Sequence, residues 1–199
     1  MTIPLNNYVP SQNGGPAPHP EVVALLPRLE TGAVLDLGCG DGRNALFLQH
    51  QGFTVSAWHN ATDALRPLPQ RQNDSTLTLE SVDLNHHRFN GQYQAILAIE
   101  SLMHLAPNAV PQVIADMQAA TCKRGYNLII CAMHTAEMPT VEGFSFTFSS
   151  GELSHYYRRW HIVHYHEQTQ IWTPPEAQAT PISLRVATLL AQKVAVKDL

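Results

Sequence analysis

The sequence has few charged residues and no long apolar run. Only 14% of its 199 residues are charged, against 44% that are hydrophobic, and the formal net charge is −4. The lack of a basic excess argues against binding to nucleic acid or to an anionic membrane surface. No run approaches 18 apolar residues, and residues 1–10 contain neither a basic nor an apolar segment. We therefore expect neither a membrane span nor a secretory signal peptide.

Cysteine is also scarce. The three cysteines, Cys39, Cys122 and Cys131, are odd in number, and no two of them have C-x-x-C spacing. This pattern argues against a disulfide scaffold and a structural zinc site, and it suits a reducing compartment. A chain of this length can bury roughly 70% of its unfolded surface in one domain. We therefore expect one cytoplasmic domain.

The order of apolar patterns predicts the fold class. Residues 1–20 are rich in Pro, Gly, Asn and Gln, which favours an N-terminal arm or flap, and residues 21–199 form the expected domain. Expected strands lie at 33–37, 53–58, 76–83, 93–99, 126–133, 161–167 and 182–191. Helical patterns lie at 20–29, 44–51, about two turns from residue 60, 107–122 and 149–159. This alternation predicts a doubly wound α/β sheet, mostly parallel, with an antiparallel pair of strands at one edge.

The strongest motif is LDLGCGDGRN, between an expected strand and an expected helix. The strand brings Asp36 to the edge of the sheet, and Gly38, Gly40 and Gly42 let a ligand approach the backbone closely. A dinucleotide fingerprint needs a glycine where Arg43 stands, which disfavours a nicotinamide-dependent oxidoreductase. An acidic group suits the ammonium and sulfonium of S-adenosylmethionine better than a diphosphate. The motif therefore indicates S-adenosylmethionine, with a tight turn that binds no ligand as the less favoured interpretation.

Further segments narrow the interpretation. They are VDLN (82–85), GYNLIICAM (125–133), GFSFTF (143–148), GELSHYY (151–157) and LRVATLLA (184–191). With the glycine motif, in order and spacing from about Glu21 to Lys193, they resemble the tellurite-resistance methyltransferase family. The resemblance implies a Rossmann-like class I methyltransferase fold, a seven-stranded sheet with its last strand antiparallel. It also implies methyl transfer from S-adenosylmethionine to a small-molecule substrate, a chalcogen oxyanion such as tellurite or selenite.

The resemblance also implies the site residues. The methionine end of the cofactor would lie at the glycine loop and beside the residues next to it. The ribose would lie beside the end of the second expected strand, and the adenine would follow the third expected strand. The expected cofactor-binding residues are Asp36, Gly38, Gly40, Gly42, Arg43, His59, Asp83, Leu84 and Ile99.

Arg185 is the expected catalytic and substrate-positioning residue. It interrupts an apolar strand, where an unpaired buried guanidinium would be very costly, so it must meet a structural carboxylate or face a pocket. The resemblance favours the pocket, where planar paired donors would match an oxyanion. His134 and Tyr157 are further candidates at the substrate site, although such a tyrosine is more often a packing residue.

The chain departs from the family pattern in ways that leave alternatives open. His59 stands where the family has an acid that holds the ribose, NGGPAP lacks the flap's aromatic residue and lysine, and Ile171-Trp172 replaces a His-Arg pair. A regulatory cofactor-binding protein without turnover, or a methyltransferase for another small molecule, therefore remains an alternative. Three histidines that follow strands, His59, His104 and His134, could bind zinc, but polar loop residues are the favoured interpretation and we expect no metal.

Overall fold

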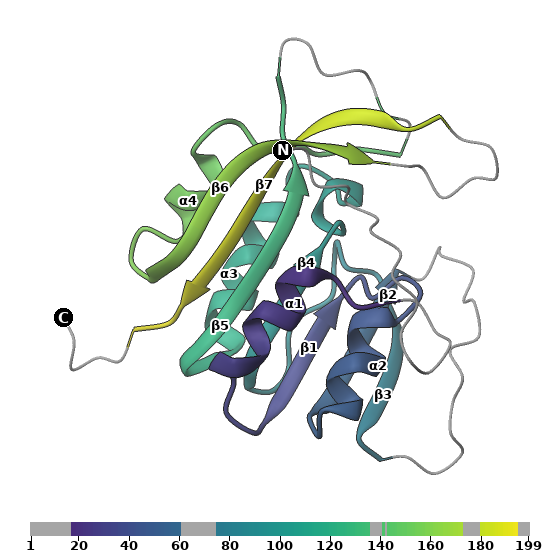
Figure 1. Ribbon diagram of the computed structural model, residues 1–199, viewed down its shortest axis with the longest axis vertical. Helices are drawn as coiled ribbons and strands as arrows, with labels where there is room; N and C mark the ends of the chain where they lie inside the picture. The colour runs from purple at the N-terminus through teal and green to yellow at the C-terminus, as the bar shows by residue number, and fades with distance from the viewer. Residues whose placement is uncertain (1–16, 61–74, 136–140, 142, 173–179, 195–199) are drawn as a thin grey trace.

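A seven-stranded sheet with strand order β3-β2-β1-β4-β5-β7-β6 forms the centre of the protein (Figure 1). The computed structural model describes residues 17–60, 75–135, 141, 143–172 and 180–194. Its elements are α1 (Pro20–Leu25), η1 (Leu26–Arg28), β1 (Ala33–Leu37), α2 (Arg43–His50), β2 (Thr54–Asn60), β3 (Leu77–Val82), β4 (Tyr93–Ile99), η2 (Leu102–His104), α3 (Val110–Ala120), β5 (Thr121–Ala132), α4 (Glu152–Tyr156), β6 (His161–Trp172) and β7 (Ile182–Gln192). The expected arm is almost entirely outside the described residues, as is most of the short helix expected from residue 60.

The direction of the strands confirms the predicted fold class. β1 pairs in parallel with β2 and β4, β2 with β3, and β4 with β5. β7, the last strand, lies antiparallel between β5 and β6. From β1 the chain first builds one edge of the sheet through β2 and β3 and then returns to place β4 on the other side. The strand order therefore reverses between β1 and β4, which is where open α/β sheets bind ligands at the carboxyl ends of strands.

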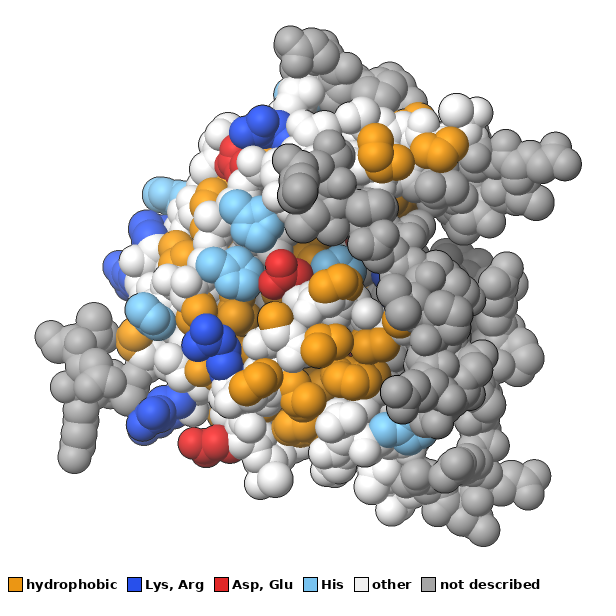
Figure 2. Space-filling view, viewed as in Figure 1, with side chains coloured by type: hydrophobic (Ala, Val, Ile, Leu, Met, Phe, Trp, Pro, Cys, Tyr) orange, Lys and Arg blue, Asp and Glu red, His pale blue; other side chains and the backbone are white. Residues whose placement is uncertain are grey.

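Hydrophobic side chains fill both faces of the sheet. The face of α3, α4 and η2 buries residues such as Leu35, Ile114 and Phe148, while the face of α1 and α2 buries residues such as Leu25 and Leu48. Figure 1 shows α1 and α2 in front of the sheet in this view, with α3 behind it. Because central strands contact both layers, they are apolar throughout rather than alternating. Hydrophobic side chains also remain at the surface between α1 and α2 (Figure 2).

The fifth and sixth strands are longer than the sequence predicts. Tyr93 pairs with Thr121 and Ala95 with Tyr126, so residues 122–125 form a bulge in β5. Arg124 adopts a left-handed φ of 62° in this bulge. Periodicity cannot reveal a strand that starts in polar residues and contains a bulge. β6 continues to Trp172 because an edge strand accepts polar residues, which conceal its length in the sequence.

Tyr157 is a core residue, which corrects the expectation that it borders the substrate. Its side chain is completely buried, and its hydroxyl donates a hydrogen bond of 2.8 Å to Asn127 Oδ1. Asn127 Nδ2 in turn donates to Thr121 Oγ1 at 2.8 Å. The ring of Tyr157 also packs edge-on against Trp160, with centroids 5.2 Å apart. This hydrogen-bonded network inside the core leaves the phenol no surface to offer a ligand.

Replacing Tyr157 with phenylalanine should therefore affect stability. Tyr157→Phe leaves Asn127 Oδ1 buried without its donor, which should lower the free energy of unfolding by about 1–3 kcal/mol. Urea denaturation measures the change. Tyr156→Phe, in the partly exposed neighbour on α4, is the matched control and should cost less than about 0.5 kcal/mol. Equal stability of Tyr157→Phe and the unaltered protein would contradict the structural assignment.

Candidate ligand-binding site

The loop between β1 and α2 is built from glycines in the left-handed region. Gly38, Gly40 and Gly42 have φ values of 75°, 54° and 74°. The backbone N–H groups of Gly38 and Cys39 both donate to the carbonyl oxygen of Trp58, each at 2.8 Å. These bonds tie the loop to the end of β2. The loop therefore lies across the carboxyl ends of the strands, at the reversal of strand order.

The glycines of this loop have different steric roles. A Cβ atom built on Gly38 would lie 2.4 Å from Cβ of Ser101, which follows β4, so a side chain at this position would clash. A Cβ atom on Gly40 would meet no heavy atom within 4 Å among the described residues. Gly38 thus allows the ends of β1 and β4 to approach each other, while Gly40 faces open space in which a ligand can contact the backbone.

Three buried oxygen atoms near the ends of β1 and β4 have no hydrogen-bond partner among the described residues: Asp36 Oδ2, Glu100 Oε1 and Ser101 Oγ. Asp36 is only 2% exposed. Burial raises its pKa to about 7, against the opposing effect of the Arg43 charge, and burial also raises the pKa of Glu100. Buried polar atoms without partners are uncommon in native proteins, so this cluster indicates a site that a ligand completes.

Glu100 carries one of these unpartnered oxygens, and the sequence analysis did not single it out. The resemblance pointed to Ile99, which is buried at the end of β4, whereas Glu100 is the next residue and carries the unpartnered carboxylate oxygen. The available signal was an acidic residue directly after the apolar run YQAILAI.

His59 and Arg43 belong to the two elements that flank the loop, β2 and α2. His59 is 4% exposed and follows Trp58, which pairs with Leu37 at the end of β1. It thus extends beyond the end of β1, where a ribose contact was expected. Arg43 begins α2, and its charge lowers the pKa of both Asp36 and Glu100. The two residues therefore approach the carboxyl edge from β2 and α2 respectively.

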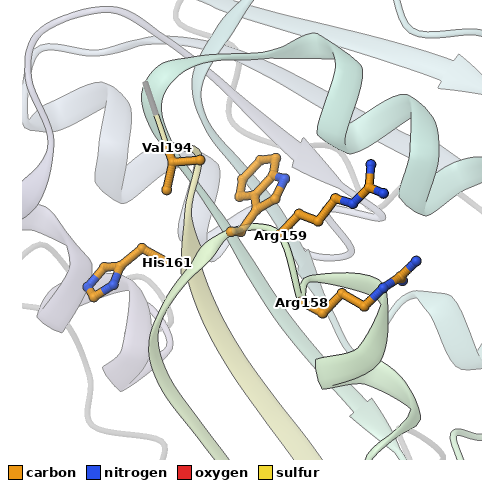
Figure 3. Close-up of a pocket in the computed structure, with 5 residues that line it drawn as sticks. Arg158, Arg159, His161 and Val194 are labelled. Atoms are coloured by element: carbon orange, nitrogen blue, oxygen red, sulfur yellow. The ribbon is translucent and has the colours of Figure 1, made fainter. Parts of the chain in front are cut away.

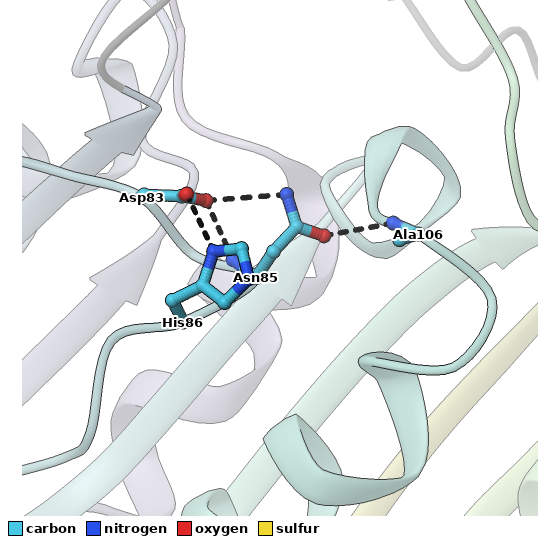
Figure 4. Close-up of polar contacts among 4 residues, drawn as sticks. All are labelled: Asp83, Asn85, His86 and Ala106. Carbon is cyan, nitrogen blue, oxygen red and sulfur yellow. Dashed lines mark hydrogen bonds and ion pairs between the residues drawn. The ribbon is translucent and has the colours of Figure 1, made fainter.

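The segment after β3 holds Asp83 in a fixed orientation (Figure 4). Asp83 Oδ1 accepts hydrogen bonds from the backbone N–H and the side-chain amide of Asn85, at 3.0 and 3.2 Å. Asp83 Oδ2 lies 2.7 Å from His86 Nδ1, and this bond lowers the pKa of Asp83. Asn85 Oδ1 accepts from Ala106 N at 2.8 Å, which joins this segment to the one after η2. Leu84, between these polar residues, is buried.

The expectation that Arg185 is a buried cation is wrong. Its side chain is 43% exposed, and Nη2 lies 3.5 Å from Glu167 Oε2, so a carboxylate partner is present. Glu167 also accepts hydrogen bonds from Ser150 Oγ at 2.8 Å and Gly151 N at 2.7 Å. The apolar neighbours Leu184 and Val186 are buried, while Arg185 is exposed between them. The Arg185 carbonyl accepts from Met133 N, so Arg185 does lie at the carboxyl end of β5.

The histidines that follow strands differ in their surroundings. His134 is exposed, with its backbone N–H bonded to the Phe148 carbonyl, and His104 Nδ1 lies 2.9 Å from the Gly143 carbonyl oxygen. His59, by contrast, is buried. In the described part of the chain, no group of three or more His, Cys, Asp or Glu side chains could hold a metal ion.

Away from the glycine loop, a hollow at the start of β6 is lined by Arg158, Arg159, Trp160, His161 and Val194 (Figure 3). Arg158 and Arg159 extend to the same side, away from His161. The hollow contains none of the expected site residues.

Over the residues that the structure describes, no helix is long and apolar enough to cross a bilayer.

Comparison with known proteins gives consistent matches. The family model of the tellurite resistance protein TehB matches residues 1–190. The chain is 36% identical over 189 residues to Hemagglutinin 1 of Eikenella corrodens, covering 94% of this chain and 63% of that protein. It is 33% identical over 177 residues to a probable S-adenosyl-L-methionine-dependent methyltransferase TehB of Haemophilus influenzae strain 10810, covering 88% and 62%. The chain thus spans slightly less than two thirds of these curated relatives.

Solved structures agree with the predicted fold. The crystal structure of TehB from Haemophilus influenzae matches with a TM-score of 0.78 and 32% identity, over 88% of this chain and 62% of that chain. A Burkholderia thailandensis 1,6-didemethyltoxoflavin-N1-methyltransferase, solved with bound S-adenosylhomocysteine, matches with a TM-score of 0.61 and 21% identity, over 88% and 76%, and supports the fold alone. The resemblance and the class I methyltransferase fold predicted from the sequence are both confirmed.

The raised pKa of Asp36 predicts a pH-dependent effect of Asp36→Asn on stability. The pKa of Asp36 is 3.8 in the unfolded chain and about 7 in the folded protein, because the folded protein disfavours the carboxylate. The unaltered protein should therefore lose stability relative to the variant as the pH rises through this range. The variant should be more stable on the order of a few kcal/mol above this range.

Urea denaturation between about pH 5 and pH 8 measures this difference. Glu30→Gln, which removes an exposed carboxyl outside this loop, is the control. A stability difference for Asp36→Asn that does not grow with pH would contradict the burial of a partly protonated carboxyl.

Proposed function

We propose that this chain, which belongs to the family of the tellurite resistance protein TehB, transfers a methyl group from S-adenosylmethionine to a small chalcogen oxyanion, with tellurite and selenite as first candidates. The observation that carries the proposal is the open glycine loop beside buried, unpartnered carboxylate oxygens at the reversal of strand order. The family name supports a tellurium oxyanion as the methyl acceptor. One relative is called Hemagglutinin 1, so the acceptor is to be identified by direct assay.

The described residues fit the proposed cofactor chemically. An ammonium donates hydrogen bonds and a sulfonium carries positive charge, which complements Asp36 Oδ2 and Glu100 Oε1. Gly40 leaves room for close approach to the loop, and His59 can offer a ring nitrogen to a ribose hydroxyl. The proposed holding residues are Asp36, Gly38, Gly40, Gly42 and Arg43 at the methionine end, His59 at the ribose, and Asp83, Leu84 and Ile99 at the adenine.

The proposed reaction asks the chain mainly to align the reactants. When bound, S-adenosylmethionine supplies a methyl carbon attached to a positively charged sulfur. The lone pair of the acceptor would form the new bond to that carbon as the neutral thioether leaves, so the residues of this chain would have to hold both reactants at the same edge of the sheet. A soft anion has a lone pair available, and it needs no general base. The described aromatic side chains near this edge can exclude water: Phe144 packs against His104 and Trp172, with centroids 5.5 and 5.2 Å away.

Arg185 is proposed to position the acceptor anion. It lies at the carboxyl end of β5, and its contact with Glu167 is long and involves one nitrogen. Glu167 is itself held by the turn at Ser150 and Gly151, so it can orient the guanidinium while other N–H groups face solvent. His134, exposed after β5, is a second proposed contact for the acceptor.

Gly40→Ala should weaken cofactor binding because its methyl group would project into the open space over the loop. Binding of S-adenosylmethionine and S-adenosylhomocysteine should each weaken by at least about tenfold, or about 1.4 kcal/mol, in isothermal titration calorimetry. Gly52→Ala is the matched control, because it also has a positive φ and open space around the added Cβ but lies at the other end of α2. Unchanged affinity in folded Gly40→Ala would remove the loop from cofactor binding.

Arg185→Lys should reduce methyl transfer and leave cofactor affinity intact, because an ammonium cannot reproduce the paired planar donors of a guanidinium. Labelled methyl transfer to tellurite, selenite and a panel of thiols should fall by about tenfold or more for the oxyanions. Arg159→Lys, in the hollow away from the loop, is the control. Full turnover in Arg185→Lys would exclude the positioning role. Cofactor binding without transfer to any acceptor would favour the regulatory, non-catalytic alternative.

A further inference from the structure

We infer that Glu100 is a second carboxylate of the cofactor site and that it makes the site select the positively charged S-adenosylmethionine over its neutral product, S-adenosylhomocysteine. This inference rests on the proposed function and adds a residue that sets the charge selectivity of the same site. S-adenosylmethionine carries an ammonium, a sulfonium and one carboxylate, and therefore a net positive charge. Loss of the methyl group converts the sulfonium into a neutral thioether, and the product is a neutral zwitterion.

The backbone of Glu100 is held in a conformation that favours glycine. Glu100 has a φ of 55°, and with Arg124 it is one of two such non-glycine residues in the described part of the chain. Its N–H donates to the Ile130 carbonyl at 2.8 Å, so pairing with β5 fixes the turn that ends β4. Strained backbone of this kind is concentrated at functional sites. A glutamate in this position therefore suggests that its side chain is needed there.

The side chain of Glu100 belongs to the same cluster as Asp36. Its Oε1 is buried without a partner among the described residues, as are Asp36 Oδ2 and Ser101 Oγ. Asp36 and Leu97 are paired in adjacent strands, and Ser101 lies against Gly38, so these groups surround one loop. Asp36, which lies beside that loop, is only 2% exposed, so a buried carboxyl is present there whatever the role of Glu100.

The charges around this cluster leave it acidic. The charge of Asp41 acts on both Asp36 and Glu100 in the unfavourable direction, and Arg43 is the cation that opposes it. The nearby His19 stays neutral, because burial and the Arg43 charge lower its pKa to about 4. Within the described residues, the carboxyls of Asp36, Glu100 and Asp41 are therefore opposed by one guanidinium, that of Arg43. A ligand with a net positive charge corrects this imbalance, and a neutral ligand does not.

Charge selectivity follows from Coulomb's law in a poorly solvated site. A carboxylate lowers the energy of every cation near it, and charges a few ångströms apart interact more strongly in such a site than in water. The ammonium is present in both ligands, whereas the sulfonium is present only in the cofactor. Removing the Glu100 charge should therefore weaken binding of the cofactor more than binding of the product. A cation also favours the ionised carboxyls, so cofactor binding should release protons near neutral pH.

The test is isothermal titration calorimetry of both ligands on the unaltered protein, Glu100→Gln, Glu100→Asp and Glu30→Gln. Glu30→Gln removes the same charge from an exposed residue just before β1, at the amino ends of the parallel strands. Glu100→Gln should lower the ratio of cofactor affinity to product affinity by at least about fivefold, and Glu30→Gln should leave it unchanged. Glu100→Asp, which keeps the charge, should restore most of the ratio.

The outcomes separate the inference from the proposed function. Equal effects of Glu100→Gln on both ligands, or no effect, would overturn the role of Glu100 and leave the cofactor assignment intact. Failure of the unaltered protein to bind either ligand would overturn both. If Glu100→Gln does not fold, Glu100→Ala replaces it in the same titrations, and equal effects on both ligands, or no effect, would again overturn the inference.

Discussion

The close approach of β1 and β4 at their carboxyl ends is the constraint on which the site depends. Gly38 can lie against Ser101 only because it has no Cβ atom, which would otherwise stand 2.4 Å from Cβ of Ser101. This contact places Asp36, Glu100 and the backbone of the glycine loop around one small volume. Asp36 Oδ2 and Glu100 Oε1 are buried beside this contact without a partner among the described residues, and such burial is unfavourable, which creates a demand for a ligand.

That demand explains why the site suits a cationic cofactor better than a diphosphate. A phosphate-binding loop presents N–H groups to an anion, whereas Gly38 and Cys39 direct their N–H groups to the Trp58 carbonyl. The buried atoms without a partner among the described residues include two carboxyl oxygens beside this loop, Asp36 Oδ2 and Glu100 Oε1. Under the proposed function His59 would contact the ribose, so cofactor binding would depend more on charge at the methionine end than on a carboxylate at the ribose.

The sequence predicted the parts of the fold and site that depend on local patterns. Glycine spacing after an apolar run located the loop, and alternation of apolar runs gave the sheet and its antiparallel last strand. Features that depend on tertiary packing were not predictable. Periodicity could not show that Arg185 emerges at an exposed end of β7, or that the hydroxyl of Tyr157 meets Asn127 inside the core. Glu100 was not singled out, because its φ and the burial of its Oε1 depend on tertiary contacts, such as the hydrogen bond from its N–H to the Ile130 carbonyl.

S-adenosylmethionine is proposed to bind over the loop between β1 and α2. Nuclear magnetic resonance of the ¹⁵N-labelled protein, titrated with the cofactor, tests this placement. Binding there should shift the backbone amides of Gly38 to Arg43, His59, Leu84 and Glu100, with little change around Arg158 to His161. Saturating cofactor that leaves the loop amides unmoved, or that shifts only residues away from the loop, would contradict binding at the loop.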